Sequence, residues 1–204
     1  MNALPRITLV TPSFNQARYL ESTLRSVLGQ RYPNLQYIVM DGGSTDGSVA
    51  IIEKYSHAIS YWKSAPDRGQ ADAIARGFDM ADGEILGWLN SDDILLHGSL
   101  ECVGRAFKEN SWPAFVSGRC VYINSGGEPW VVHVPRRRSW RRMVYQGHGL
   151  CQQSTFWSRR AYESSGGLNE TLQFSFDYEL FVRLCQVQRP VLLEQVLAGF
   201  RIHA

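Results

Sequence analysis

The sequence predicts an α/β domain with a mixed, mainly parallel sheet flanked by helices. Short β-branched runs alternate with segments of helical periodicity through the first half of the chain, as parallel strands joined by crossover helices require. Polar segments directly follow three of these runs. Because ligands in such sheets bind beyond the carboxyl ends of the strands, we expect the three polar segments to share one crevice.

The elements of the first half follow from the spacing of apolar residues. Strands are predicted at Ile7–Thr11, Gln36–Met40, Ile59–Lys63, Ile85–Leu89 and Ala114–Tyr122. Helices are predicted at Arg18–Leu28, from a cap at Ser44 or Thr45 to Lys54, at Gln70–Met80 and at Leu100–Lys108. In the first helix, for example, Leu20, Leu24 and Val27 fall on one face.

The second half is less regular. Asn124–Glu128 is predicted to be a hairpin tip, Leu150–Trp157 a buried strand, and Ser158–Ser165 and Asp177–Val187 helices. No internal repeat or linker interrupts the chain, which predicts a single domain over residues 1–204. The final strand-like run reaches the last residues, so we expect the natural chain to extend further.

Composition excludes several classes of protein. The hydrophobic fraction of 44% and charged fraction of 20% are those of a globular domain, and a net charge of +2 does not indicate nucleic-acid binding. The four cysteines are too widely spaced for a zinc site or a disulfide framework. The sequence shows neither a signal peptide nor an apolar run that could span a bilayer. We expect a cytoplasmic protein, with peripheral docking at the inner face of the membrane as an option.

Two adjacent carboxylates, Asp92 and Asp93, follow the predicted strand Ile85–Leu89 within the segment Asn90-Ser91-Asp92-Asp93. Such a pair repels itself unless a cation, water or hydrogen-bond donors offset the charge. Mg²⁺ and Mn²⁺ take oxygen ligands of this kind together with substrate phosphates. The alternative is a solvated turn. The position at the end of a strand favours a metal site.

Asp41 also follows a predicted strand, and two glycines follow it. Glycines allow a ligand to approach the backbone closely, and an Asp can accept a hydrogen bond from a nucleotide base or ribose. The alternative is an Asx-type turn that leads into the next helix.

The ordered segments VTPSFNQARYLESTLRSVLGQ, YIVMDGGSTDGS, DRGQADAI and GWLNSDD resemble those of the family 2 glycosyltransferases. These are inverting enzymes with the Rossmann-like GT-A fold, and they use nucleoside diphosphate sugars. The resemblance covers nearly the entire chain. It implies a nucleotide-binding half at about residues 1–95 and an acceptor-binding half at about residues 96–204.

The resemblance also implies roles for particular residues. Thr11 and Pro12 are expected to line the base pocket, and Asp41 is expected to accept a hydrogen bond from the base. Asp67, Gly69 and Gln70 are expected beside the nucleotide, Asp92 near the ribose or the metal-bound diphosphate, and Asp93 as the ligand of Mn²⁺ or Mg²⁺. Turn and cap roles are the alternative for each. One departure is Ala75, where the family often has Asn.

An inverting transfer needs a carboxylate to take the proton of the acceptor hydroxyl. By resemblance this base is Asp177, and Glu179 is the second choice. A role as helix N-cap is the alternative for Asp177. The family usually has an acidic residue just before this Asp, whereas Phe176 stands there in this chain.

Three further features of the sequence have candidate roles. His203 is expected as an additional metal ligand, with a strand-end histidine as the alternative. His148, Gln152 and Gln153 are candidate contacts to the donor or acceptor sugar. Arg136, Arg137, Arg138, Arg141 and Arg142 surround Trp140, so five arginines fall within eight residues. Such a run is usually a solvated face, but it also suits the surface of an anionic membrane.

The resemblance therefore implies a metal-dependent inverting glycosyltransferase with a UDP-sugar as the favoured donor. The acceptor is expected to be a saccharide or a lipid-linked saccharide, and bacterial cell-surface polysaccharide or glycolipid synthesis is the expected process. The rivals are a nucleotidyltransferase on a similar sheet and a nucleotide-sugar-binding module without turnover. A Rossmann dehydrogenase is disfavoured, because no Gly-x-Gly-x-x-Gly follows the first strand.

Overall fold

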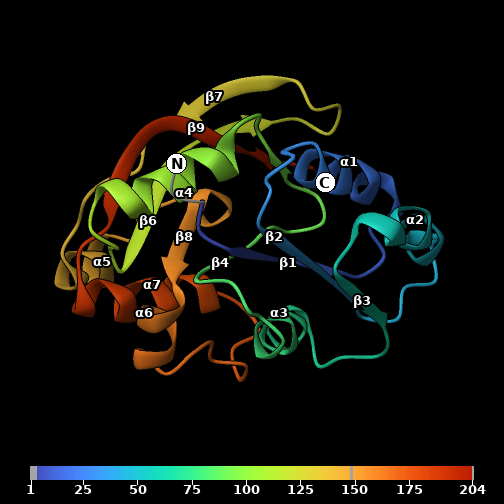
Figure 1. Cartoon of the computed structure of the whole chain (residues 1–204), viewed down its shortest axis with the longest axis horizontal. Helices are drawn as coiled ribbons and strands as arrows, with labels where there is room; N and C mark the ends of the chain where they lie inside the picture. The colour runs from blue at the N-terminus through green and yellow to red at the C-terminus, as the bar shows by residue number, and fades with distance from the viewer. Residues whose placement is uncertain (1–3, 148, 204) are drawn as a thin grey trace.

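The computed structural model describes residues 4–147 and 149–203. Across these residues a nine-stranded sheet has the order β3-β2-β1-β4-β8-β6-β9-β5, and β7 pairs with β6 (Figure 1). The strands are β1 (Ile7–Ser13), β2 (Leu35–Asp41), β3 (Tyr61–Ser64), β4 (Ile85–Trp88), β5 (Ile94–Leu95), β6 (Phe115–Ile123), β7 (Pro129–His133), β8 (Thr155–Ser158) and β9 (Val191–Arg201). The helices are α1 (Ala17–Leu28), α2 (Ser48–Tyr55), α3 (Gln70–Asp79), α4 (Ser99–Glu109), α5 (Trp140–Gln146), α6 (Arg159–Ser164) and α7 (Phe176–Val187).

The helices cover both faces of the sheet, and each face has its own core. On one side α1, α2 and α4 pack against Leu9, Val39 and their neighbours. On the other side α3, α6 and α7 pack against Val10, Ile38 and Trp88. Figure 1 shows the first group above the strands and the second group below them. Alternate residues of β1 enter opposite cores because side chains along a strand point to opposite faces.

The two halves of the sheet differ in strand direction. In the first half β1 is parallel to both β2 and β4, and β2 is parallel to β3. In the second half β8 runs antiparallel to β4 and β6, while β6 and β9 are parallel. The expectation of a mixed, mainly parallel α/β sheet is confirmed. The aligned strand ends Ser13 and Asp41 place the following loops at one edge.

Several local predictions were wrong. The helix α2 is preceded by Gly47 in the left-handed conformation (φ 101°) rather than capped by Ser44 or Thr45. Leu150–Trp157 is not one strand, because Gln152–Ser154 forms a 3-10 turn before β8. The strands β5 and β7 were not predicted: the first has two residues, and the second is largely exposed and lacks apolar alternation.

Two expectations about composition can be compared with the structure. The four cysteines are free thiols, and Cys120, Cys151 and Cys185 are buried. None of the helices formed by the described residues is both long and apolar enough to cross a membrane.

Candidate functional site

The polar segments that follow the parallel strands meet in one pocket of about 600 Å³, here called the strand-end pocket. Pro12 and Ser13 line it from the end of β1, and Gly42 from the residue after β2. The loop from β3 to α3 contributes Asp67, Gly69 and Gln70, and the residues after β4 contribute Asn90, Ser91 and Asp92. The convergence predicted from the sequence is therefore present.

Thr11 does not line this pocket. Its side chain is fully buried, and its hydroxyl lies 3.0 Å from the hydroxyl of Tyr37 inside the core. Thr11 follows Val10 along β1, and successive side chains of a strand point to opposite faces. The expected base-pocket contact through the Thr11 side chain is thus not supported, whereas its neighbour Pro12 does line the pocket.

Asp41 is the last residue of β2, and its carboxylate organises the loop that follows. It accepts hydrogen bonds from the amides of Gly43 and Ser44 and from the hydroxyls of Ser44 and Ser64. Only 3% of the residue is exposed. Asp41 therefore forms the Asx-type turn that the sequence offered as the alternative. A small cavity beside Asp41 shares Asp67 with the strand-end pocket, so the residue Asp41 lies close to that pocket.

Asp67 and Gly69 form a tight turn at the start of α3. The Asp67 carboxylate accepts a hydrogen bond from the Gly69 amide at 2.8 Å. Gly69 has φ 114°, a conformation that favours glycine. The same carboxylate passes so close to Gly42 that a Cβ there would lie 2.8 Å from an Asp67 oxygen. Both glycines therefore shape the pocket wall.

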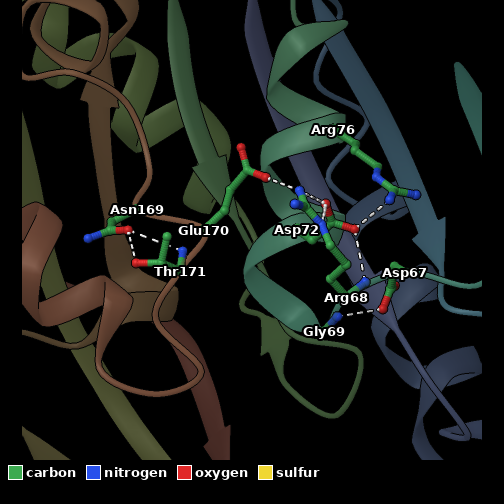
Figure 2. Close-up of polar contacts among 8 residues, drawn as sticks. All are labelled: Asp67, Arg68, Gly69, Asp72, Arg76, Asn169, Glu170 and Thr171. Atoms are coloured by element: carbon green, nitrogen blue, oxygen red, sulfur yellow. Dashed lines mark hydrogen bonds and ion pairs between the residues drawn. The ribbon is translucent and has the colours of Figure 1, made fainter.

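The buried carboxylate of Asp72 holds this turn in place, because it accepts a hydrogen bond from the Arg68 amide. Its side chain is 1% exposed and receives ion pairs from Arg68 and Arg76 at 2.6 and 2.7 Å. Figure 2 shows Asp72 on α3 between the two arginines, with Glu170 approaching Arg68 from the loop before α7. Burial by itself would raise the pKa of Asp72, but the hydrogen bonds from Arg68 and the charge of Arg76 hold it below the ordinary value.

Asp92 faces the strand-end pocket, with a side chain that is 26% exposed. One of its carboxylate oxygens lies 2.9 Å from Nε2 of His203. The His203 ring packs on Tyr19 of α1, with ring centroids 4.7 Å apart. These two contacts bring a histidine that is distant in sequence to the loop after β4.

Asp93 points away from the pocket into the protein. The residue is 1% exposed, and one carboxylate oxygen accepts a hydrogen bond from the Arg201 amide. Burial and the neighbouring Asp92 raise the pKa of Asp93 well above its ordinary value. The Arg201 guanidinium donates to the main-chain oxygen of Asp92. This bond holds the end of β9 against the loop after β4. The other carboxylate oxygen of Asp93 is buried without a hydrogen-bond partner among the described residues, whereas Asp92 lines the pocket.

The described residues include no group of three or more His, Cys, Asp or Glu side chains arranged to hold a metal. The pair Asp92 and His203 nevertheless fits a divalent cation of the Mn²⁺ or Mg²⁺ type. Such ions commonly take one or two protein ligands and complete their shell with phosphate oxygens and water. Imidazole and carboxylate together suit Mn²⁺ better than Mg²⁺, which prefers oxygen alone.

A second pocket of about 340 Å³ adjoins the first and contains Asp177, so we call it the Asp177 pocket. Gln70 and Asn90 line both pockets. The Gln70 amide donates to the Asn90 side-chain oxygen at 2.7 Å, so this pair marks the boundary between the pockets. A ligand that bridges the two pockets must pass these two amides.

Asp177 is a half-buried residue in the first turn of α7. The N-cap of this helix is Ser175, not Asp177, so the N-cap alternative does not apply. The second choice, Glu179, lies outside the lining of the Asp177 pocket and pairs with Arg183 at 2.6 Å.

Several lining residues were missed by the sequence analysis. Tyr122 and Phe200 reach the Asp177 pocket from β6 and β9, and Phe174 reaches it from the loop before α7. Single aromatic residues in strands carry no signal of a site. The expected contacts Gln152 and Gln153 do line this pocket, whereas Ala75 is buried and lines neither pocket. His148 lies outside the described residues.

The arginine segment forms an exposed surface around α5. Arg136, Arg137, Arg141 and Arg142 are exposed, and the Arg141 guanidinium lies 5.3 Å from the centre of the Trp140 ring. Arg138 differs from these four because it is half-buried and donates to the main-chain oxygens of Gln146 and Gly147. Arg138 therefore holds the segment in place.

This α/β architecture places two adjoining pockets, each lined by at least one aspartate, beyond the ends of its parallel strands. The family model described as glycosyl transferase family 2 matches residues 8–166. That match covers well over half of the chain, so the chain belongs to glycosyl transferase family 2.

Relatives agree with this assignment. An uncharacterized glycosyltransferase of Mycobacterium tuberculosis is 28% identical over 207 residues, which cover 98% of this chain and 76% of the relative. Chondroitin synthase of Escherichia coli is 23% identical over 200 residues, which cover 92% of this chain and 27% of that protein.

Solved structures establish the GT-A fold. TarS 1-349 of S. aureus, in complex with UDP-GlcNAc, superposes with a TM-score of 0.78 at 16% identity over 98% of this chain and 59% of that chain. The mannosyltransferase PcManGT of Pyrobaculum calidifontis, in complex with GDP-Man and Mn²⁺, superposes with a TM-score of 0.70 at 20% identity. That match covers 96% of this chain and 56% of the mannosyltransferase chain.

Proposed function

We propose that this chain transfers a sugar from a nucleoside diphosphate sugar to an acceptor hydroxyl, with inversion at the anomeric carbon. The observation that carries the proposal is the junction of the two pockets at Gln70 and Asn90. The strand-end pocket has Asp92 on its wall, and the adjoining pocket contains Asp177. A donor in the first pocket would direct its sugar across the boundary toward the second.

In this proposal the nucleoside lies near Pro12 and Asp67, with Asp41 in the adjoining small cavity as the contact for the base. Gly42, Gly69 and Gln70 form the wall beside it. A UDP-sugar is the favoured donor, since TarS was solved with UDP-GlcNAc. GDP-mannose, which PcManGT holds, is the second candidate.

Asp92 and His203 are proposed to hold a divalent cation beside the diphosphate. A cation bound there would neutralise the charge that develops on the departing nucleoside diphosphate. Asp93 is proposed to support the loop instead, because one of its carboxylate oxygens is bonded to the Arg201 amide and the residue does not line the pocket. This differs from the role that the family resemblance implied for Asp93.

Asp177 is proposed as the general base. Its carboxylate takes the proton of the acceptor hydroxyl while that oxygen forms a bond to the anomeric carbon. The bond from the anomeric carbon to the diphosphate oxygen breaks on the opposite face, and the nucleoside diphosphate leaves with the electron pair. The product is a glycoside of inverted configuration, and the chondroitin synthase relative supports a polysaccharide as the product class.

The first experiment is calorimetric titration of UDP, GDP and dTDP with and without Mn²⁺. We expect one nucleotide to bind in a metal-dependent manner, and Asp92→Asn to weaken that binding at least tenfold. Asp93→Asn is the matched control, because an Asn side-chain oxygen can still accept from the Arg201 amide. If only Asp93→Asn weakened nucleotide binding, Asp93 rather than Asp92 would be the metal ligand. Binding of no nucleotide by the folded protein would reject the donor site.

A second proposal concerns location at a membrane. The four exposed arginines and Trp140 suit the headgroup region of an anionic bilayer, since each basic residue near such a surface contributes about 1 kcal/mol. Replacing Arg136, Arg137, Arg141 and Arg142 by Ser should abolish co-sedimentation with vesicles rich in phosphatidylglycerol. The control removes the same charge elsewhere, at Arg31, Arg105, Arg160 and Arg189. Equal sedimentation of both variants would reject the proposal.

A further inference from the structure

The charge of the Asp177 pocket sets a condition on its ligand. Of the described residues that line this pocket, Asp177 alone carries a full charge, and no lysine or arginine is among them. A phosphate or carboxylate placed here would face the Asp177 carboxylate without a compensating cation. Because like charges brought close together repel, the pocket disfavours anionic ligands.

The remaining polar lining consists mainly of neutral amides. Their common property is that each offers both hydrogen-bond donors and acceptors without charge. They are Gln70, Asn90, Gln152, Gln153 and Gln173. Gln152 is anchored, because its amide donates to the main-chain oxygen of Trp88 at 2.8 Å. Ligand hydroxyl groups complement these amides, because a hydroxyl also both donates and accepts hydrogen bonds.

One wall of the pocket is a supported group of aromatic rings. Tyr122 and Phe200 line the pocket with ring centroids 5.6 Å apart. Behind them the Tyr122 ring contacts Trp130 and stacks on His133, both from β7, at 6.1 and 6.2 Å. These contacts fix the orientation of Tyr122, so its surface is preorganised.

Phe174 supplies a further aromatic ring to the pocket lining. It is 84% exposed, although it lines the pocket. Its neighbour Phe176 instead packs against Trp88 and is 6% exposed. Ser175 between them has φ 60°, a conformation that is uncommon for a residue with a side chain. This turn packs the Phe176 ring into the core, where it still borders the pocket, and leaves the Phe174 ring exposed at the pocket, an arrangement that burial of apolar surface alone does not explain.

A pyranose ring combines an apolar face of C–H groups with an edge of hydroxyls. Its apolar face suits the electron-rich face of an aromatic ring, and its hydroxyls suit amides. We infer that the Asp177 pocket binds a neutral saccharide residue as the acceptor, with Tyr122, Phe200 and Phe174 as specificity-determining residues. This inference rests on the proposed function, because it names the substrate that would present its hydroxyl to Asp177.

The test uses saturation-transfer NMR on the protein with its nucleoside diphosphate and diamagnetic Mg²⁺ in place of Mn²⁺. The probes are methyl β-glucoside and methyl β-glucuronide, which differ only in a carboxylate at C6. We expect the neutral glucoside to receive saturation on its ring C–H protons, and the glucuronide to bind at least tenfold more weakly. Phe174→Ala should reduce the glucoside signal severalfold without unfolding the protein, since this side chain is exposed. Tyr61→Ala, an exposed aromatic on the distant strand β3, is the matched control.

A second variant adds a charge to the pocket and removes no packed side chain, so its effect cannot come from lost packing. Gln173 is exposed at the pocket, and Gln173→Lys should bring glucuronide binding to within about threefold of glucoside binding. Equal binding of both probes to the wild type, or a glucoside signal unaffected by Phe174→Ala, would overturn the inference. So would saturation confined to the alkyl chain of octyl β-glucoside, which would indicate a lipid site.

Failure of the inference and failure of the proposed function give different results. Calorimetry on the same samples reports nucleotide binding. Intact nucleotide binding without glucoside binding overturns the neutral-saccharide pocket and leaves the transferase proposal in place. Glucoside binding that depends on Phe174, in a protein that binds no nucleotide, supports the saccharide pocket and rejects the transferase proposal.

Discussion

The strand-end pocket and the Asp177 pocket differ in how their polar groups are held. In the first, the carboxylates of Asp41 and Asp67 are bonded to the amides of their own loops, and Asp72 fixes the loop from the core. In the second, amides and aromatic rings from six separate segments meet around Asp177. The first pocket is encoded by contiguous loops, whereas the second depends on how distant segments pack.

This contrast suggests a division of roles. A ligand common to a large family can be bound by loops whose geometry is fixed locally by glycine and Asx turns. A ligand that varies among members is better served by side chains on independent strands and loops. The following predictions test whether the two pockets can be disturbed separately.

The largest separate effect is expected at Asp177. Asp177→Asn removes the proposed proton acceptor and should lower the transfer rate by about 10²–10⁴-fold, the usual contribution of a general base. Nucleotide binding in the strand-end pocket should stay unchanged, because Asp177 lines only the other pocket. The measurement is the initial transfer rate beside calorimetric titration of the nucleotide. Glu179→Gln, two residues along α7 and outside the pocket lining, should retain activity; the reverse pattern would make Glu179 the base.

The next effect concerns the support of the strand-end pocket. Asp72→Asn keeps the size of the side chain but removes a charge that pairs with Arg68 and Arg76. We expect a loss of about 2 kcal/mol in the free energy of unfolding, since hydrogen bonds to charged groups contribute about 1.5–3 kcal/mol. The arginines themselves are 71% and 42% exposed, so they regain water and limit the loss. Urea denaturation of wild type and Asp72→Asn measures this loss in the free energy of unfolding.

Glu170→Gln is the control for Asp72. The Arg68–Glu170 pair is exposed, with side chains 71% and 40% accessible, and such pairs contribute below about 1 kcal/mol. A larger loss from Glu170→Gln than from Asp72→Asn would contradict the role of the buried carboxylate.

The same carboxylate predicts a dependence of stability on pH. The pKa of Asp72 is lower in the folded protein than in the unfolded chain, so folding favours the ionised form. Its contribution is complete above the ordinary pKa of an aspartate and is lost as the pH falls through the lowered value. Wild type should therefore lose more stability than Asp72→Asn between about pH 5 and pH 2. Parallel stability curves for the two proteins would reject this contribution.

The two pockets also differ in how far the sequence could predict them. The residues of the strand-end pocket follow predicted strands, so Pro12, Asp67, Gly69, Gln70 and Asp92 could be named before the structure. The sequence could not distinguish Asp92 from Asp93, because which carboxylate is buried depends on the pairing of β5 with β9 and on Arg201. Tyr122 and Phe200 could not be found, since their meeting depends on the register of β6 and β9. Local turn chemistry is readable from sequence, and strand pairing over long separations is not.

The smallest effect tests the wall shared by Gly42 and Asp67. A methyl group at Gly42 would lie 2.8 Å from an Asp67 carboxylate oxygen, and Asp67 is bonded to the Gly69 amide. Gly42→Ala should therefore displace Asp67 toward the pocket and weaken nucleotide binding about tenfold, which corresponds to about 1.4 kcal/mol. Gly126→Ala in the β6–β7 turn, where the nearest atom is the end of the Asn124 side chain, is the control. Glucoside binding should be unchanged in both variants, because neither residue lines the Asp177 pocket. If Gly42→Ala weakened both ligands equally, the two pockets would not be separable.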